Sequence, residues 1–175
     1  MVKEFCGYVI IGHSERRTYF GETDETVNRK LRAALKFGLI PIVCVGETLD
    51  QYESGQTAEV VRRQIARGFA EVDSASAARI VVAYEPVWAI GTGKAATTDQ
   101  AVAAHRTIRS FLSDTWSIDV ASATRILYGG SVTPGNIEGL LQADQIDGAL
   151  IGGACLQAES FVTIASVAQL IGARR

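Results

Sequence analysis

The chain has 175 residues, of which 47% are hydrophobic and 21% are charged, and this composition is typical of a globular protein with one sizeable core. The formal net charge of −2 and the lack of a basic run argue against a nucleic-acid surface, so an anionic ligand would have to be held by local backbone dipoles. No apolar run is long enough to span a bilayer, and residues 1–5 show no signal peptide, so we expect no contact with a membrane.

The three cysteines do not indicate a metal site. Cys6, Cys44 and Cys155 lack the spacing of metal ligands, and they are odd in number. Reduced thiols in a cytoplasmic protein are the simpler interpretation.

Two buried strands open the chain, residues 8–11 and residues 39–45, each a short apolar run rich in β-branched side chains. Between them Asp24 is expected to cap a helix that ends at Gly38, because apolar side chains recur there at helical spacing. That stripe consists of Val27, Leu31, Ala34 and Leu35. A second helix, over about residues 57–69, returns the chain towards a third strand.

The third strand, residues 80–83, leads into the stretch YEPVWAIGTGK at residues 84–94. Glu85 is a lone carboxylate where that strand ends, and Pro86 removes a backbone donor, so the strand cannot simply continue. An apolar segment followed by glycines suits a hinged lid that excludes water. From this stretch alone, an ordinary strand-to-helix loop with a packed tryptophan is an equal alternative.

The second half of the chain repeats the alternation of strands and helices. Thr98 is expected to cap a long helix in which His105 belongs to the apolar stripe and is therefore structural. Residues 125–127 form a fourth strand, and the Thr-Pro pair at residues 133–134 predicts the start of the next helix. A fifth strand over residues 148–151 precedes the last helix. That helix carries the apolar residues Phe161, Ile164, Ala165 and Ala168.

Five strand-helix units in a row predict an α/β fold with one parallel sheet and helical crossovers. No linker or change of composition divides residues 1–175, so we expect a single domain. In such a fold the functional residues gather in the loops that follow the carboxyl ends of the strands. These loops contain Gly12-His13, Gly46-Glu47, Tyr84-Glu85, Gly129-Gly130-Ser131 and Gly152-Gly153. The coincidence of the unusual residues at one rim favours a catalytic site.

Glu85 and His13 are the candidate catalytic residues. A carboxylate beside an apolar lid suits a general base that takes a proton from carbon. An imidazole at the start of a helical turn stays neutral, because the helix dipole disfavours its charged form, and it can then stabilise an enediolate by hydrogen bonding. Taken alone, His13 would more often be a structural histidine, but its place at a strand end favours the catalytic role.

Two glycine turns follow the last two predicted strands, at residues 129–131 and residues 152–153. Glycines let backbone amides approach an anion closely. The loops after the last two strands of a (β/α)₈ barrel form the usual phosphate site of that fold. The sequence therefore predicts that these turns bind a phosphate group.

Four motifs together resemble the triosephosphate isomerase family. Residues 8–17 (YVIIGHSERR) resemble its histidine motif, and residues 83–94 (AYEPVWAIGTGK) resemble its catalytic glutamate and closing loop. Residues 128–132 (YGGSV) and residues 151–154 (IGGA) resemble its phosphate-binding turns. The resemblance runs from about Phe5 to the end of the chain.

The resemblance implies a homodimeric cytoplasmic enzyme of glycolysis and gluconeogenesis that interconverts two triose phosphates without a cofactor or metal. It implies Glu85 as the proton-transferring base and His13 as the electrophile. The phosphate contacts that it implies are Gly91, Ser131, Gly152 and Gly153. The family fold is a barrel of eight strands, and the five predicted here resemble the fourth to the eighth. The expected fold is therefore a partial (β/α)₈ barrel that lacks the first three units. The asparagine and the lysine that the family uses to contact substrate belong to these absent units.

Two other interpretations remain open from the sequence. The chain could be a catalytically silent part of a barrel that acts only in binding or assembly. It could also belong to another sugar-phosphate isomerase of barrel fold, although the histidine and lid motifs favour triosephosphate isomerase.

Overall fold

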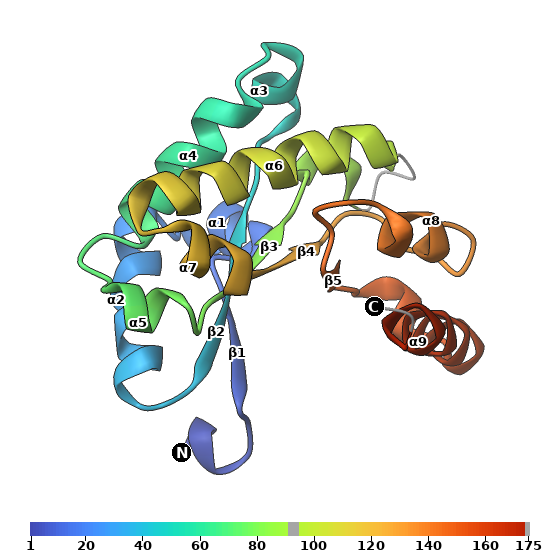
Figure 1. Cartoon of the computed structure of the whole chain (residues 1–175), viewed down its shortest axis with the longest axis horizontal. Helices are drawn as coiled ribbons and strands as arrows, with labels where there is room; N and C mark the ends of the chain where they lie inside the picture. Colours follow the sequence, from blue (N-terminus) through green and yellow to red (C-terminus); the bar gives the residue numbers. More distant parts are fainter. Residues whose placement is uncertain (91–94, 174–175) are drawn as a thin grey trace.

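The computed structural model describes residues 1–90 and 95–173 and contains one five-stranded sheet (Figure 1). Its strands are β1 (Tyr8–Ile11), β2 (Ile40–Val45), β3 (Val81–Tyr84), β4 (Arg125–Tyr128) and β5 (Gly148–Ala149). All neighbouring strands are parallel and follow one another in chain order. The prediction of an α/β fold with one parallel sheet is confirmed.

The helices of the described chain lie in the crossovers between the strands, except for the last one, which follows β5. They are α1 (Ser14–Phe20), α2 (Asp24–Lys36), α3 (Leu49–Glu53), α4 (Thr57–Gly68), α5 (Ser74–Ala77), α6 (Thr98–Thr115), α7 (Ile118–Ala123), α8 (Ile137–Gln142) and α9 (Ala158–Gly172). The described ranges also contain three 3₁₀ helices: η1 (Val2–Glu4) precedes β1, η2 (Val87–Ala89) follows β3, and η3 (Gly153–Leu156) follows β5. In Figure 1, α2, α4, α6 and α7 gather on one side of the sheet, whereas α8 and α9 lie beside β5. No helix of the described ranges combines the length and hydropathy needed to cross a bilayer.

Two predicted helix caps are one residue too late. Thr23 caps α2 instead of Asp24, since its hydroxyl accepts from the N–H of Thr26. Thr97 caps α6 instead of Thr98, and Gln100 completes that capping box. In each case two neighbouring residues could cap the helix, and the one whose side chain reaches the third helical amide does so.

The helix predicted from residues 133–134 starts later than expected. A turn occupies residues 134–136, and α8 begins at Ile137. The Asn136 side chain explains the delay, because it accepts from the N–H of Thr133 at 2.8 Å and donates to the carbonyl of Ser131 at 2.9 Å. These bonds stabilise a turn in place of a first helical turn.

The core lies between the sheet and helices α2, α4 and α6. Its buried apolar members include Val27, Leu31, Val43, Ile65, Val82, Ile108, Leu112 and Ile126. The predicted stripe of α2 is buried except for Leu35, which is partly exposed. The opposite face of the sheet is less covered, since Tyr8 and Ile10 of β1 are 47% and 48% exposed.

His105 is a buried histidine on α6, as its place in the apolar stripe predicts. Its Nδ1 lies 3.0 Å from the carbonyl oxygen of Gln145, and its ring meets that of Tyr84 edge-on. Burial lowers the pKa of His105 from its ordinary value of 6.5 to about 4; the Gln145 hydrogen bond and Asp147 oppose this effect, and Arg109 adds to it. His105 is therefore neutral in the folded chain near pH 7.

This burial makes stability depend on pH. Between about pH 6.5 and pH 4 the unfolded chain binds a proton at His105 that the folded chain does not. The free energy of unfolding should therefore fall by up to about 3 kcal/mol as the pH is lowered through this window, and the contribution is fully present above it. Urea denaturation at several pH values should show that His105→Asn loses this part of the dependence. An equal decline in the parent and the variant would contradict the prediction.

Candidate active site

The two predicted catalytic residues meet at the carboxyl ends of the strands. His13 lies between β1 and α1, and Glu85 directly follows β3. Nε2 of His13 lies 3.0 Å from Oε1 of Glu85. The Glu85 side chain is only 3% exposed, whereas that of His13 is 32% exposed. A buried carboxylate and a more open imidazole thus form a direct pair.

The start of α1 binds the second oxygen of the same carboxylate. The backbone N–H of Ser14 donates to Oε2 of Glu85 at 2.9 Å. The N–H of Glu15 donates to Nδ1 of His13 at 3.3 Å, so Nδ1 acts as an acceptor and the ring proton belongs on Nε2. The N–H of Nε2 is thus directed at Glu85. Ser14 was missed from the sequence because a backbone donor has no side-chain signature.

The environment of Glu85 raises the pKa of its carboxyl group. Burial raises the pKa of Glu85, while His13, the Ser14 amide, the Cys44 thiol and Arg17 oppose that rise. Burial and the neighbouring Glu85 carboxylate raise the pKa of the Cys44 thiol as well. Cys44 is therefore a neutral thiol in contact with Glu85, a role that the sequence analysis did not assign.

Gly46 allows the backbone of Glu85 to approach β2. A Cβ at Gly46 would lie 1.8 Å from the carbonyl oxygen of Glu85. The Gln64 side chain binds both backbone polar groups of Gly46. It accepts from the N–H at 2.7 Å and donates to the carbonyl at 3.0 Å. Any larger residue at position 46 would displace Glu85.

Glu47 connects the residues on both sides of Glu85. Its side chain has no exposed surface, and its Oε1 accepts from the Tyr84 hydroxyl at 3.0 Å and from Nε1 of Trp88 at 2.9 Å. Its backbone carbonyl accepts from the N–H of Val87 at 3.1 Å. The sequence placed Glu47 at the rim without a role, and the structure shows it as an anchor for the chain around Glu85.

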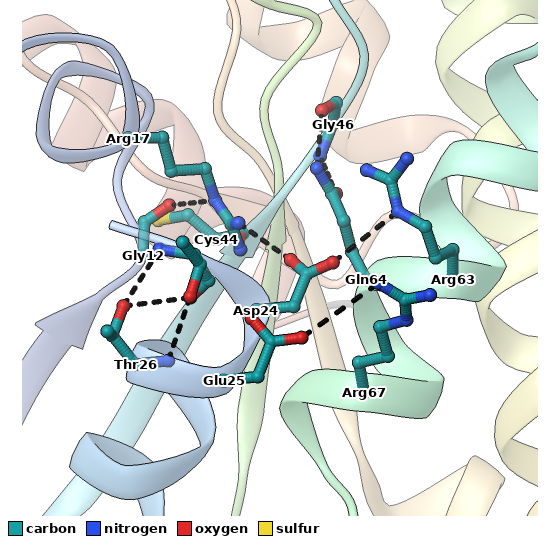
Figure 2. A network of polar contacts seen from close by, with 11 residues as sticks. Gly12, Arg17, Asp24, Glu25, Thr26, Cys44, Gly46, Arg63, Gln64 and Arg67 are labelled. Atoms are coloured by element: carbon teal, nitrogen blue, oxygen red, sulfur yellow. Dashed lines mark hydrogen bonds and ion pairs between the residues drawn. The ribbon is translucent and has the colours of Figure 1, made fainter. Parts of the chain in front are cut away.

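Arg17 joins the ends of β1 and β2 through a network of polar contacts (Figure 2). Its guanidinium donates to the carbonyl oxygens of Gly12 at 2.9 Å and Cys44 at 3.4 Å, and to Asp24 at 2.8 Å. Asp24 also pairs with Arg63 of α4. Gly12 turns the chain with a φ of 72°, a conformation that other residues rarely adopt. This network fixes the turn that carries His13.

A cavity of about 590 Å³ opens beside the pair formed by His13 and Glu85. His13, Glu85 and Ile90 line one part of it, and residues 129–133 and 150–154 line another. Ser131, Gly152 and Gly153 therefore face the same space as His13 and Glu85. Gly91, the remaining predicted contact, lies outside the described residues.

Close packing does not explain why residues 152 and 153 are glycines. A Cβ at either position would meet no heavy atom within 4 Å, and neither residue has a positive φ. Within the described chain, the N–H groups of Ser131, Gly152 and Gly153 donate no hydrogen bond to a protein acceptor. These groups are available to a ligand in the cavity. No set of three or more His, Cys, Asp or Glu side chains in the described ranges is placed to hold a metal ion.

Comparisons with known proteins agree with the motifs. The sequence profile of the family described as triosephosphate isomerase matches residues 1–168. The triosephosphate isomerase of Geobacter metallireducens is 55% identical over 164 residues, which are 94% of this chain and 65% of that protein. That of Syntrophotalea carbinolica is 55% identical over 159 residues, covering 91% of this chain and 63% of the relative. That of Dehalococcoides mccartyi is 53% identical over 171 residues, covering 98% and 66%. The chain spans about two thirds of the length of these relatives, and it belongs to the triosephosphate isomerase family.

Proposed function

We propose that this chain carries the catalytic pair of a triosephosphate isomerase, which interconverts dihydroxyacetone phosphate and D-glyceraldehyde 3-phosphate through an enediolate. The observation that carries the proposal is the 3.0 Å contact between His13 and the buried Glu85 carboxylate, beside a cavity lined by glycine turns. The family is itself the established example of a glutamate base beside a neutral histidine. The reaction belongs to glycolysis and gluconeogenesis and uses no cofactor or metal.

Glu85 acts as the base that moves a proton between the two carbons. Its oxygens are bound to His13 and Ser14 in this structure, so the carboxylate must exchange these bonds to reach a carbon in the cavity. The raised pKa of Glu85 brings the carboxyl group closer to the pH at which it has to accept and return a proton.

His13 acts as the electrophile that stabilises the enediolate. The N–H that it now directs at Glu85 becomes available to a substrate oxygen once the carboxylate moves. The Glu15 amide holds the acceptor nitrogen of the ring, so the donor stays on the cavity side. A neutral donor suits an oxygen whose negative charge grows only in the transition state.

The phosphate group binds to the backbone amides of Ser131, Gly152 and Gly153, with Gly91 as a further contact. Support comes from the free N–H groups and from the open space at the two glycines. Because the net charge of the chain is slightly negative, an anion has to be bound by local backbone dipoles and not by an overall positive charge.

The chain corresponds to the last five units of the family barrel, in one domain over residues 1–175. Five parallel strands in chain order and a match to about two thirds of each relative support this placement. The missing units would supply the asparagine and lysine contacts to substrate. We further propose that the enzyme is a cytoplasmic homo-oligomer. In-frame coding sequence upstream, with an asparagine and a lysine on an apolar strand, would establish the placement.

The alternative is a catalytically silent barrel part that acts only in binding or assembly. A polypeptide with the N-terminal third of the Geobacter metallireducens relative in front of residues 1–175, here named the extended polypeptide, separates the two proposals. The silent alternative predicts no isomerase activity from it in a coupled assay, whereas the proposed function predicts rapid turnover.

Gly153→Val should weaken the binding of glycerol 3-phosphate to the extended polypeptide by at least about tenfold. A branched side chain would project into the cavity and keep the amides from the anion. Calorimetric titration measures the affinity, and Gly139→Val is the matched control. Gly139 lies on α8 outside the cavity, and a Cβ there also meets no atom within 4 Å. Equal affinities of Gly153→Val and the parent would show that this turn does not contact the ligand.

A further inference from the structure

Tyr52 of the short helix α3 contacts the chain on both sides of residues 91–94. Its ring stacks on that of Trp88 in η2, with centroids 4.3 Å apart and planes inclined by 26°. Its hydroxyl accepts a hydrogen bond from Nε2 of Gln100 in the first turn of α6. One side chain thus joins the segment that follows Glu85 to the helix that comes after residues 91–94.

At the first contact, Tyr52 completes the fixation of the Trp88 indole. Glu47 holds the ring by its edge through the 2.9 Å bond from Nε1. The stacked Tyr52 ring packs against the face of the same indole, so Glu47 and Tyr52 together contact its edge and its plane. Trp88 follows Glu85 by three residues, and Val87 between them donates to the Glu47 carbonyl. The orientation of the indole therefore bears on the path of the backbone at Glu85.

At the second contact, the Tyr52 hydroxyl binds the side chain of Gln100, which also caps α6. Oε1 of Gln100 accepts from the N–H of Thr97 at 2.7 Å, and the N–H of Gln100 donates to Oγ1 of Thr97 at 3.2 Å. The other end of the same amide donates to Tyr52. The first turn of α6 and the position of Tyr52 are consequently coupled.

The helix that carries Tyr52 is itself fixed to the site. Thr48 caps α3 and forms a capping box with Gln51, and Thr48 directly follows Glu47. The anchor of Trp88 and the ring that stacks on it therefore belong to one short continuous segment.

We propose that Tyr52 is a positioning residue, which sets the geometry of residues 86–90 and 97–100 together and thereby that of Glu85. It has no contact with the catalytic cavity, whose lining does not include it. It acts through Trp88 and Gln100.

Amide hydrogen exchange on residues 1–175 tests this proposal without an activity assay. Tyr52→Phe keeps the ring and removes the hydroxyl, so the amides of Thr97 and Gln100 should exchange about fivefold faster while those of Val87, Ala89 and Ile90 stay unchanged. Tyr52→Leu removes both contacts, so both sets of amides should exchange faster by similar factors.

The control for this experiment is Glu53→Ala, an exposed position on the same helix, which should change neither set. Amides of β3 report on the core and should not change in any variant. The proposal would be overturned if Tyr52→Leu changed the exchange rates of neither set of amides. It would also be overturned if the β3 amides exchanged faster by the same factor as those of the two segments.

The catalytic consequence rests on the proposed function. In the extended polypeptide, Tyr52→Leu should lower kcat on the order of tenfold and change KM by less than about twofold, because a misplaced base affects the transition state more than ground-state binding. Unchanged kcat in an active extended polypeptide would contradict the link to Glu85. An extended polypeptide that is inactive before any substitution would instead refute the proposed function, and the exchange rates would still decide the role of Tyr52.

Discussion

Glu85→Gln should lower kcat of the extended polypeptide by about a thousandfold, within the ~10²–10⁴-fold range of positioned acid–base groups. Glutamine keeps the size of the side chain, and its oxygen can still accept from Ser14. It has no basic oxygen, and its NH₂ group would face the N–H of His13. The variant therefore removes the proton acceptor while the fold is retained.

A coupled isomerase assay with both triose phosphates measures this effect. Glu59→Gln, the same change at an exposed position of α4, is the control and should leave kcat unchanged. A Glu85→Gln variant that retains more than roughly a tenth of the parent activity would rule out Glu85 as the base.

The strands were predictable because each is a short, local run of apolar residues. The β1 prediction matches its observed bounds, Tyr8–Ile11, and the others differ by one or two residues at their ends. The helices α3, α5 and α7 were not predicted, because at four to six residues they are too short to show an apolar period. Helix termini were least certain, since a neighbouring Thr or Asn side chain decides them.

The meeting of His13 and Glu85 was predictable from topology alone. Parallel strands bring the loops at their carboxyl ends to one rim, whatever the distance along the sequence. The partners of this pair could not be predicted in the same way. Cys44 and Glu47 lie at the end of β2 and act through buried contacts to Glu85, Tyr84 and Trp88. Such contacts depend on side-chain directions that a single sequence does not reveal.

A polypeptide of residues 1–175 alone should associate in solution and have less than about one hundredth of the isomerase activity of the extended polypeptide. Both β1 and β5 are edge strands, and an unpaired apolar edge promotes association. On β1, Tyr8 and Ile10 are about half exposed on the face that a closed barrel would fill. On α9, Ile164 is the one buried residue among the described ones, while Phe161, Val162 and Leu170 are 52–61% exposed.

The loss of activity should follow from the missing substrate contacts, since one lost electrostatic contact can cost ~10²–10³-fold. Sedimentation velocity and the coupled assay on the same sample test both parts, with the extended polypeptide as the control. The added units of the extended polypeptide would cover the β1 edge and the exposed face of α9, so only the proposed homo-oligomer should remain in that sample. A compact and active monomer of residues 1–175 would show that five units suffice for catalysis, and the proposed need for the first three units would be wrong.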